Sequence, residues 1–162
     1  MSVTAGDSLT FFSKNSITCP VCNNEFRRED LRTGRGRLIA GSLTEELRRL
    51  YEPTEKYGEV NPLIYPITVC PACLYAAFPQ DFNEIPKSTA QSLENSRDAR
   101  RTVLSKVFPD LDFTQPRDIK SGVAAYHYAM MSMEQFPAEM SPTIKKGICA
   151  LRSAWLCNDL HR

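Results

Sequence analysis

Two short cysteine motifs are the residues in this chain whose type and spacing best fit a defined chemistry. One is Cys19-Pro-Val-Cys22 and the other is Cys70-Pro-Ala-Cys73. A tight Cys-x-x-Cys turn can place two thiolates at two corners of a tetrahedron, and a second such turn can supply the other two corners. Four thiolates in this arrangement form a ligand set that zinc prefers in structural sites. The doubled motif therefore predicts one zinc ion held by Cys19, Cys22, Cys70 and Cys73.

The ligand set also indicates what the metal does. Four cysteines fill the tetrahedron and leave no position for water or substrate, so we predict a structural and not a catalytic zinc. A thiol redox role or an iron–sulfur site is the alternative, because Cys-x-x-Cys motifs also serve those functions. Redox motifs normally accompany a strand–helix unit, and neither turn here precedes an obvious long helix.

The segments around the turns have the pattern of short strands. Residues 15–26 indicate one strand before the first turn and one after it, and residues 64–69 indicate a strand that leads into Cys70. The two turns are separated by an insertion, residues 23–69. A shared ion remains compatible with that separation, since the entropy of loop closure grows only slowly with length.

The insertion must carry structure of its own, and its middle part indicates a short helix. Ser42 lies three residues before Glu45, which is the capping-box spacing, and Pro53 would end the helix. Its apolar face would consist of Leu43, Leu47 and Leu50.

The residues that follow the two turns differ. Asn23 follows the first turn, and asparagine tolerates a left-handed backbone conformation. Leu74 occupies the matching place after the second turn, where it would be strained. We therefore expect the second turn to have a different geometry.

The second half of the chain has a helical pattern. One helical segment is expected from Ser88, with a Ser88–Gln91 capping box, to Pro109, and another from Pro116 to Phe136. Ser141-Pro142 restarts a helix, which makes an antiparallel hairpin with the one before it. The apolar stripe of this last helix consists of Ile144, Ile148, Leu151 and Trp155. We expect Trp155 to lie in the core.

The fold class predicted is α+β, with a leader at 1–14, a zinc-ribbon-like domain at 15–80 and a helical region at 88–162.

The combined pattern resembles the bacterial family known as domain of unknown function 2225. The resemblance rests on the two cysteine motifs, on Phe26 and Leu50-Tyr51, on the segment from Asn61 to Tyr65 and on Tyr75-Ala76-Ala77. The later helices resemble a tetratricopeptide-like region. One departure is Leu74, where the family pattern has glycine. The resemblance implies a zinc-binding module joined to a helical interaction surface, and it implies no reaction.

Charge and hydropathy narrow the class of protein. The chain has 162 residues and a formal net charge of +1, which argues against a general nucleic-acid binder. It has no apolar run long enough to span a membrane and no signal-peptide pattern at its start. We therefore expect a cytoplasmic protein with reduced cysteines.

The segment from Arg27 to Arg37 is the best candidate for contact with nucleic acid. It contains five arginines, which are Arg27, Arg28, Arg32, Arg35 and Arg37.

The other chemically reactive residues favour structural roles. Cys149 and Cys157 are too far apart along a helix to form a disulfide, and buried thiols are the better interpretation. His127 has no carboxylate at a helical spacing, which favours a packed or half-exposed histidine. We find no serine elbow, phosphate-binding loop or metalloprotease motif.

The sequence thus favours a non-enzymatic zinc scaffold or adaptor that binds protein, including copies of itself or parts of a larger bacterial assembly. A zinc-ribbon nucleic-acid binder is the alternative, and a thiol redox protein is a weaker one.

Overall fold

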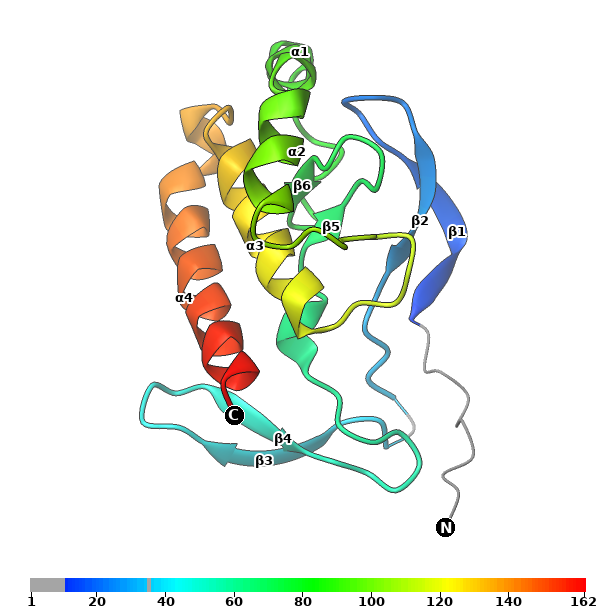
Figure 1. The fold of residues 1–162 in the computed structure, drawn as a ribbon, viewed down its shortest axis with the longest axis vertical. Helices are drawn as coiled ribbons and strands as arrows, with labels where there is room; N and C mark the ends of the chain where they lie inside the picture. Colours follow the sequence, from blue (N-terminus) through cyan, green and yellow to red (C-terminus); the bar gives the residue numbers. More distant parts are fainter. Residues whose placement is uncertain (1–10, 35) are drawn as a thin grey trace.

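The computed structural model describes residues 11–34 and 36–162, and it confirms an α+β fold in which small antiparallel strand pairs precede the helices (Figure 1). The strands in the described residues are β1 Phe12–Thr18, β2 Glu25–Glu29, β3 Ile39–Leu43, β4 Arg49–Glu52, β5 Thr68–Val69 and β6 Ala76–Ala77. The α-helices are α1 Lys87–Asn95, α2 Arg97–Ser105, α3 Ile119–Met133 and α4 Pro142–Leu160, and the short 3-10 helices are η1 Pro62–Ile64 and η2 Ala138–Met140.

Two of the strand pairs flank the cysteine turns. In β1–β2, Thr18 pairs with Glu25 across the first turn, and in β5–β6, Val69 pairs with Ala76 across the second. The strands predicted around the first turn are confirmed, but β1 already begins at Phe12, within the expected leader. Residues 1–10 of that leader lie outside the described residues.

The short helix predicted from Ser42 is wrong, because β3 and β4 form an antiparallel hairpin there. The backbone N–H of Thr44 donates to the carbonyl of Arg48, and Leu47 adopts a positive φ of 62° in the turn. Arg48 also forms a salt bridge with Asp159 of α4. A helix of two turns is marginal in isolation, so the strand pairing within the segment and the salt bridge to α4 decide its conformation.

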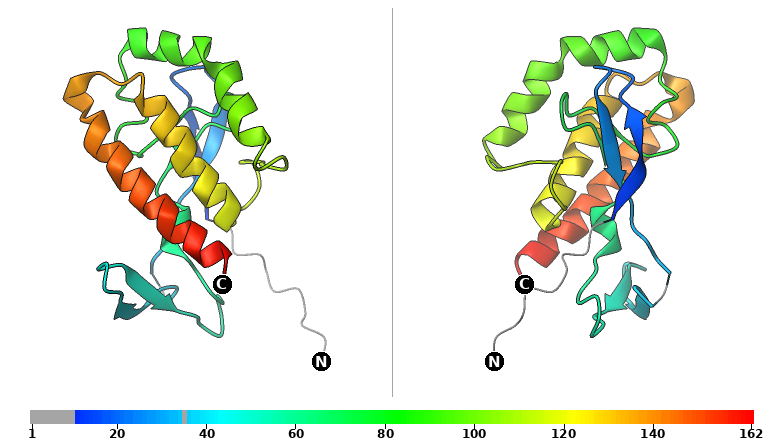
Figure 2. Two further views of the ribbon diagram at one scale, coloured as in Figure 1. Left: turned by 60° about the vertical axis from the view of Figure 1, so that its left-hand side comes forward. Right: turned by 90° about the vertical axis from the view of Figure 1, so that its right-hand side faces the viewer.

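The helical segment predicted between Ser88 and Pro109 is two helices in the structure. α1 ends at Asn95 and α2 begins at Arg97, so the chain bends at Ser96 between them (Figure 2). The predicted capping box is also wrong, because α1 begins directly after Pro86 and has no side-chain cap. The bend directs α2 toward the second cysteine turn, where Arg100 donates to the Cys73 carbonyl.

Helices α3 and α4 form the predicted antiparallel hairpin (Figures 1 and 2). α3 begins at Ile119 and not at Pro116, because Asp118 caps it: the Ser121 backbone N–H donates to the Asp118 carboxylate, and the Asp118 backbone N–H donates to the Ser121 hydroxyl oxygen. The predicted break at Phe136-Pro137 and the restart at Pro142 are confirmed.

The apolar stripe of α4 does not face the core. The buried residues of α4 are Cys149, Ser153 and Leu156, whereas Ile144, Ile148 and Leu151 are exposed and Trp155 is half-buried. The hydroxyl of Ser153 lies 3.3 Å from Nε2 of His127 on α3, so a polar contact is part of the α3–α4 interface. Small and polar residues take part in this close packing, whereas Ile144, Ile148 and Leu151 lie outside it.

Glycine permits a close contact where α3 crosses the middle of the fold. A Cβ on Gly122 would lie 3.1 Å from the Cα of Ile64 in η1 and 3.1 Å from Cδ1 of Leu156 in α4. The hydroxyl of Tyr126 donates to the Leu63 carbonyl at 2.8 Å and secures the same junction. Among the described helices, none is long and apolar enough to cross a membrane.

Candidate metal centre

The two cysteine turns have the same backbone structure. In each, the N–H of the first cysteine donates to the carbonyl five residues later, from Cys19 to Asn24 and from Cys70 to Tyr75, both at 2.9 Å. In each, the N–H four residues later donates back to that cysteine, from Asn23 and from Leu74, again both at 2.9 Å. The two motifs therefore form two copies of one turn, each between paired strands.

The expectation that the second turn has a different geometry is wrong. Asn23 and Leu74 both adopt a φ of 61°, in the left-handed region. The shared hydrogen bonds require this conformation, and the half-buried Leu74 side chain packs against the core. Leu74 thus adopts a conformation that costs a residue with a Cβ roughly 1–2 kcal/mol, and its packing offsets part of that cost.

The four sulfur atoms lie close enough together to bind one metal ion. Sγ of Cys19 lies 3.7 Å from Sγ of Cys73, and Sγ of Cys22 lies 3.6 Å from Sγ of Cys70. All four sulfurs lie within 4.8 Å of one another. A tetrahedral zinc ion with bonds of about 2.3 Å to sulfur requires edges of roughly 3.8 Å. Because the pairs that approach come from different turns, a bound ion would join the turns to each other.

The proton affinities of three of the clustered thiols depend on one another. The hydrogen bond with Cys70 raises the pKa of Cys19 to about 12, and the hydrogen bonds with Cys19 and Cys70 raise the pKa of Cys73. The pKa of Cys70 is lowered to about 2, because Cys19 and Cys73 donate to its sulfur. A thiolate at Cys70 is thus stabilised by neighbouring thiols that keep their protons, and a metal ion bound at the cluster would compensate the charge of further thiolates.

Burial protects most of the cluster from solvent. Cys19, Cys70 and Cys73 are fully buried, whereas Cys22 is half-buried. Tyr75, next in the chain after Leu74, is also fully buried, and its ring stacks on Phe82 at a centroid distance of 4.7 Å. The cluster therefore lies directly on the hydrophobic core.

Three arginines of α2 hold the second turn, and sequence analysis did not identify them. Arg97 and Arg101 both donate to the Ala72 carbonyl, at 3.1 and 2.8 Å. The buried Arg100 donates to the Cys73 carbonyl at 3.1 Å. Their spacing of three and four residues places them on one helical face, and this spacing is the sequence feature that could have identified them. Their positive charges would also offset the net negative charge that one divalent ion and four thiolates carry together.

The described arginines between Arg27 and Arg37 make mostly local contacts. Arg28 pairs with Asp30 at 2.7 Å, Arg32 donates to the Phe12 carbonyl and Arg37 donates to the Gly34 carbonyl. Arg27 lines a pocket of about 460 Å³ beside Pro71 and Ala72, and Arg35 lies outside the described residues. The nucleic-acid interpretation of this segment stays a prediction.

The remaining sulfur and imidazole groups lie apart from the cluster. Cys149 is fully buried, as expected, and burial raises the pKa of its thiol to about 11. Cys157 is half-buried. His127 is half-buried, and burial lowers its pKa.

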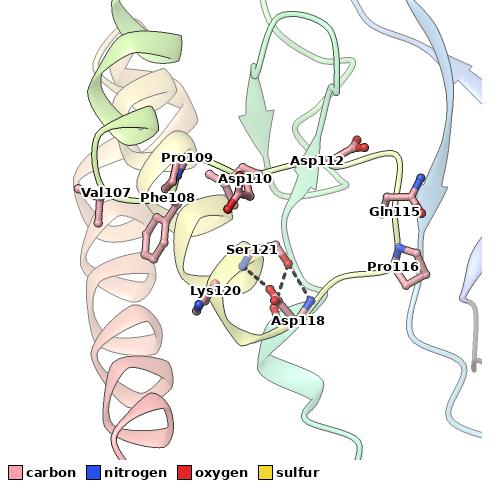
Figure 3. Close-up of a pocket in the computed structure, with 11 residues that line it drawn as sticks. Val107, Phe108, Pro109, Asp110, Asp112, Gln115, Pro116, Asp118, Lys120 and Ser121 are labelled. Carbon is pink, nitrogen blue, oxygen red and sulfur yellow. Dashed lines mark hydrogen bonds between the residues drawn. The ribbon is translucent and has the colours of Figure 1, made fainter.

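A pocket of about 310 Å³ lies between the end of α2 and the start of α3 (Figure 3). Its polar side chains include Asp112, Asp118 and Ser121. Asp118 and Ser121 bond to each other across the first turn of α3, and Asp112 accepts hydrogen bonds from Thr114. These groups stabilise the loop and the helix start, and none of them is a ligand of the cysteine cluster.

The fold and the cluster define an α+β protein with four cysteines in a metal-binding arrangement, consistent with a zinc-ribbon-like module. The chain belongs to the bacterial family described as "Uncharacterized protein conserved in bacteria (DUF2225)", which it matches over residues 12–162.

One relative of the chain is an "Uncharacterized protein" of Borreliella burgdorferi, 42% identical over 154 residues. The matched region covers 95% of this chain and 55% of the relative, so the chain spans about half the length of that protein. No solved structure matches the chain. These comparisons confirm the family expected from the cysteine motifs and the segments between them.

Proposed function

We propose that this protein is a non-enzymatic scaffold in which one zinc ion fixes the fold and a helical surface binds protein. The observation that carries the proposal is the closed set of four cysteine ligands from two turns of the same geometry. Four thiolates complete the coordination of zinc, so the ion would have no free position for substrate. This arrangement favours a structural role.

The position of the cluster shows what the ion would stabilise. It lies where the β1–β2 hairpin, the β5–β6 hairpin and the arginine face of α2 meet. These elements come from distant parts of the chain, and their strand pairs are too short to be stable alone. A metal ion that joins them would contribute directly to the free energy of folding.

The outer face of α4 supports the second half of the proposal. Its exposed residues between Thr143 and Asn158 are uncharged and include Ile144, Ile148 and Leu151. An exposed aliphatic surface without charge is typical of a protein contact and not of a nucleic-acid contact. We place the protein and its partner in the cytoplasm, where thiols remain reduced and available to zinc.

The test compares partners recovered with three versions of the tagged chain in the bacterium that encodes it. These are the wild type, Ile148→Glu on the outer face of α4, and Val103→Glu at an exposed site on α2. After cross-linking, we expect Ile148→Glu to lower the yield of specific partners at least about tenfold, and Val103→Glu to leave it unchanged. Equal yields from all three proteins, each with its zinc retained, would contradict a protein-binding role of α4.

A further inference from the structure

The pocket beside Arg27 lies next to the cysteine cluster. It is formed where the β1–β2 hairpin, the second cysteine turn and the loop between α2 and α3 meet (Figure 1). That loop is held against β2, because the backbone N–H of Arg117 donates to the Glu29 carboxylate. The volume of about 460 Å³ is within the range of small-ligand pockets. The apolar residues that line it are Phe12, Phe26, Pro71, Ala72 and Phe113.

Arg27 gives this pocket a positive charge that no described residue neutralises. Its side chain is exposed, and its guanidinium forms no hydrogen bond or salt bridge with the part of the chain that the structure describes. The neighbouring arginines differ, since Arg28 pairs with Asp30, and Arg32 and Arg37 donate to backbone carbonyls. Within residues 27–34 and 36–37, Arg27 is therefore the arginine whose charge is available to a ligand.

A second positive charge lies next to the same cysteine turn. The exposed Arg101 of α2 donates to the Ala72 carbonyl at 2.8 Å, and Ala72 lines the pocket. Arg101 forms no salt bridge with any residue that the structure describes. Because Arg27 comes from β2 and Arg101 from α2, an anionic chain that passes over this turn would contact both guanidinium groups.

Two polar side chains of the pocket have hydrogen-bonding capacity to spare. Glu25 accepts from the Ser16 hydroxyl with one carboxylate oxygen, and no described residue bonds to the other oxygen. The Asn24 side chain directs its nitrogen toward Sγ of Cys70 at 4.0 Å, and its oxygen has no partner in the described ranges. An apolar side chain of a partner protein would cover these groups without bonding to them, which is unfavourable.

A nucleotide matches all of these features. The face of a base stacks on aromatic side chains, and its edge bonds to groups such as the Glu25 carboxylate and the Asn24 amide. Its phosphate carries the negative charge that Arg27 lacks as a partner. The exposed rim and the second guanidinium on α2 favour a strand with successive phosphates.

We propose that this pocket binds one unpaired nucleotide of a single-stranded nucleic acid, with the base in the pocket and the neighbouring phosphates on Arg27 and Arg101. The site is separate from the outer face of α4 and goes beyond the proposed scaffold role. It is compatible with a net charge of +1, because a strand held at one base and two phosphates requires no general basic surface.

Fluorescence anisotropy of the zinc-loaded chain tests the proposal, with a fluorescein-labelled single-stranded RNA of about 10 nucleotides and mixed sequence as the probe. We expect binding at about 50 mM salt, and a plot of log K against log salt with a slope of about −1.4 for two phosphates. Arg27→Gln should weaken binding at least about fivefold and reduce the steepness of the slope by about 0.7. The matched control is Arg37→Gln, which removes the same charge outside the pocket and should change binding by less than about twofold.

Phe12→Leu distinguishes a base in the pocket from attraction by charge alone. It removes an aromatic ring from the lining and keeps an apolar side chain, so it should weaken binding about fivefold and leave the salt slope unchanged. Zinc content and the far-ultraviolet circular dichroism of each variant serve as controls for folding.

Three results would overturn the inference. They are the absence of binding at low salt, equal losses in Arg27→Gln and Arg37→Gln, and equally tight binding of a duplex with the same sequence, whose bases are not available. Competition by a free nucleoside monophosphate at the affinity of the strand would overturn the strand as the occupant. Each of these results leaves the proposed scaffold function intact, because that function rests on a different surface.

Discussion

At the scale of single residues, the two cysteine turns adopt one backbone conformation with different side chains. Asn23 and Leu74 occupy equivalent positions with the same φ of 61°. Asparagine accepts this conformation readily, whereas leucine does so at a cost. The position is therefore defined by the hydrogen bonds of the turn and not by the preference of the residue that fills it.

This argument predicts unequal effects on the free energy of unfolding for two substitutions of Leu74. Leu74→Val should lower the free energy of unfolding by about 1–2 kcal/mol, because a β-branched side chain is strongly disfavoured at positive φ. Leu74→Asn should stay within about 1 kcal/mol of the wild type, since relief of strain offsets the lost packing. Urea unfolding with zinc present measures both, and equal losses would show that packing, not backbone conformation, governs this site.

The cysteines could be predicted from sequence because their chemistry is local and is repeated in two motifs. The spacing of Arg100 from Arg97 and Arg101 predicts a shared face of α2, but its contact with the cysteine turn could not be predicted, because the Cys73 carbonyl is 27 residues away. Its local acceptor, the Ser96 hydroxyl, does not reveal that Arg100 is 2% exposed.

At the scale of elements, α2 holds the second cysteine turn through Arg100. Arg100→Met should destabilise the fold by about 3 kcal/mol, because the Leu93 and Cys73 carbonyls and the half-buried Ser96 hydroxyl each lose a hydrogen bond from a buried guanidinium. It should also speed the transfer of zinc to a chelator, since the Cys73 backbone becomes less constrained. The matched control is Arg101→Met, an exposed residue that donates to the neighbouring Ala72 carbonyl and should cost about 1 kcal/mol or less. Similar zinc release from both variants would refute a special role for Arg100.

The packing of α3 against its neighbours gives a second paired prediction. Gly122→Ala should destabilise the fold by about 1–3 kcal/mol, because the added methyl group meets the Ile64 backbone at 3.1 Å. Gly147→Ala lies in open space on α4 and should stabilise it by up to about 1 kcal/mol through helix propensity. Thermal unfolding of both variants checks the contrast, and a neutral Gly122→Ala would show that α3 can move away from η1.

The elements that sequence analysis missed are those decided by distant contacts. The pattern around Ser42 fits a helix, but the segment is a hairpin whose turn is tied to α4 through Arg48 and Asp159. Periodicity predicts the apolar stripe of α4, but the stripe faces outward and not into the core. Helix α4 is buried through Cys149 and Leu156, because α3 packs against that side. Periodicity marks an apolar face and does not say which partner covers it.

At the scale of the whole molecule, the cluster joins two hairpins and α2 around one point next to the core. The α+β class and the family were predictable, because the order of strand-like and helical segments is visible along the chain. The packing of these elements against one another was not predictable, because it depends on contacts between residues far apart in sequence. A zinc ion at the cluster would connect them with four bonds, and the fold is then expected to depend on it.

Metal analysis of the purified protein, together with two cysteine variants, tests this central claim most directly. We expect one zinc ion per chain in the wild type and in Cys149→Ser, a variant of a buried cysteine outside the cluster. Cys70→Ser should lose the zinc and, with it, cooperative unfolding. A wild-type protein that folds without zinc, or one that contains iron and absorbs visible light, would contradict the structural zinc site and favour the redox alternative.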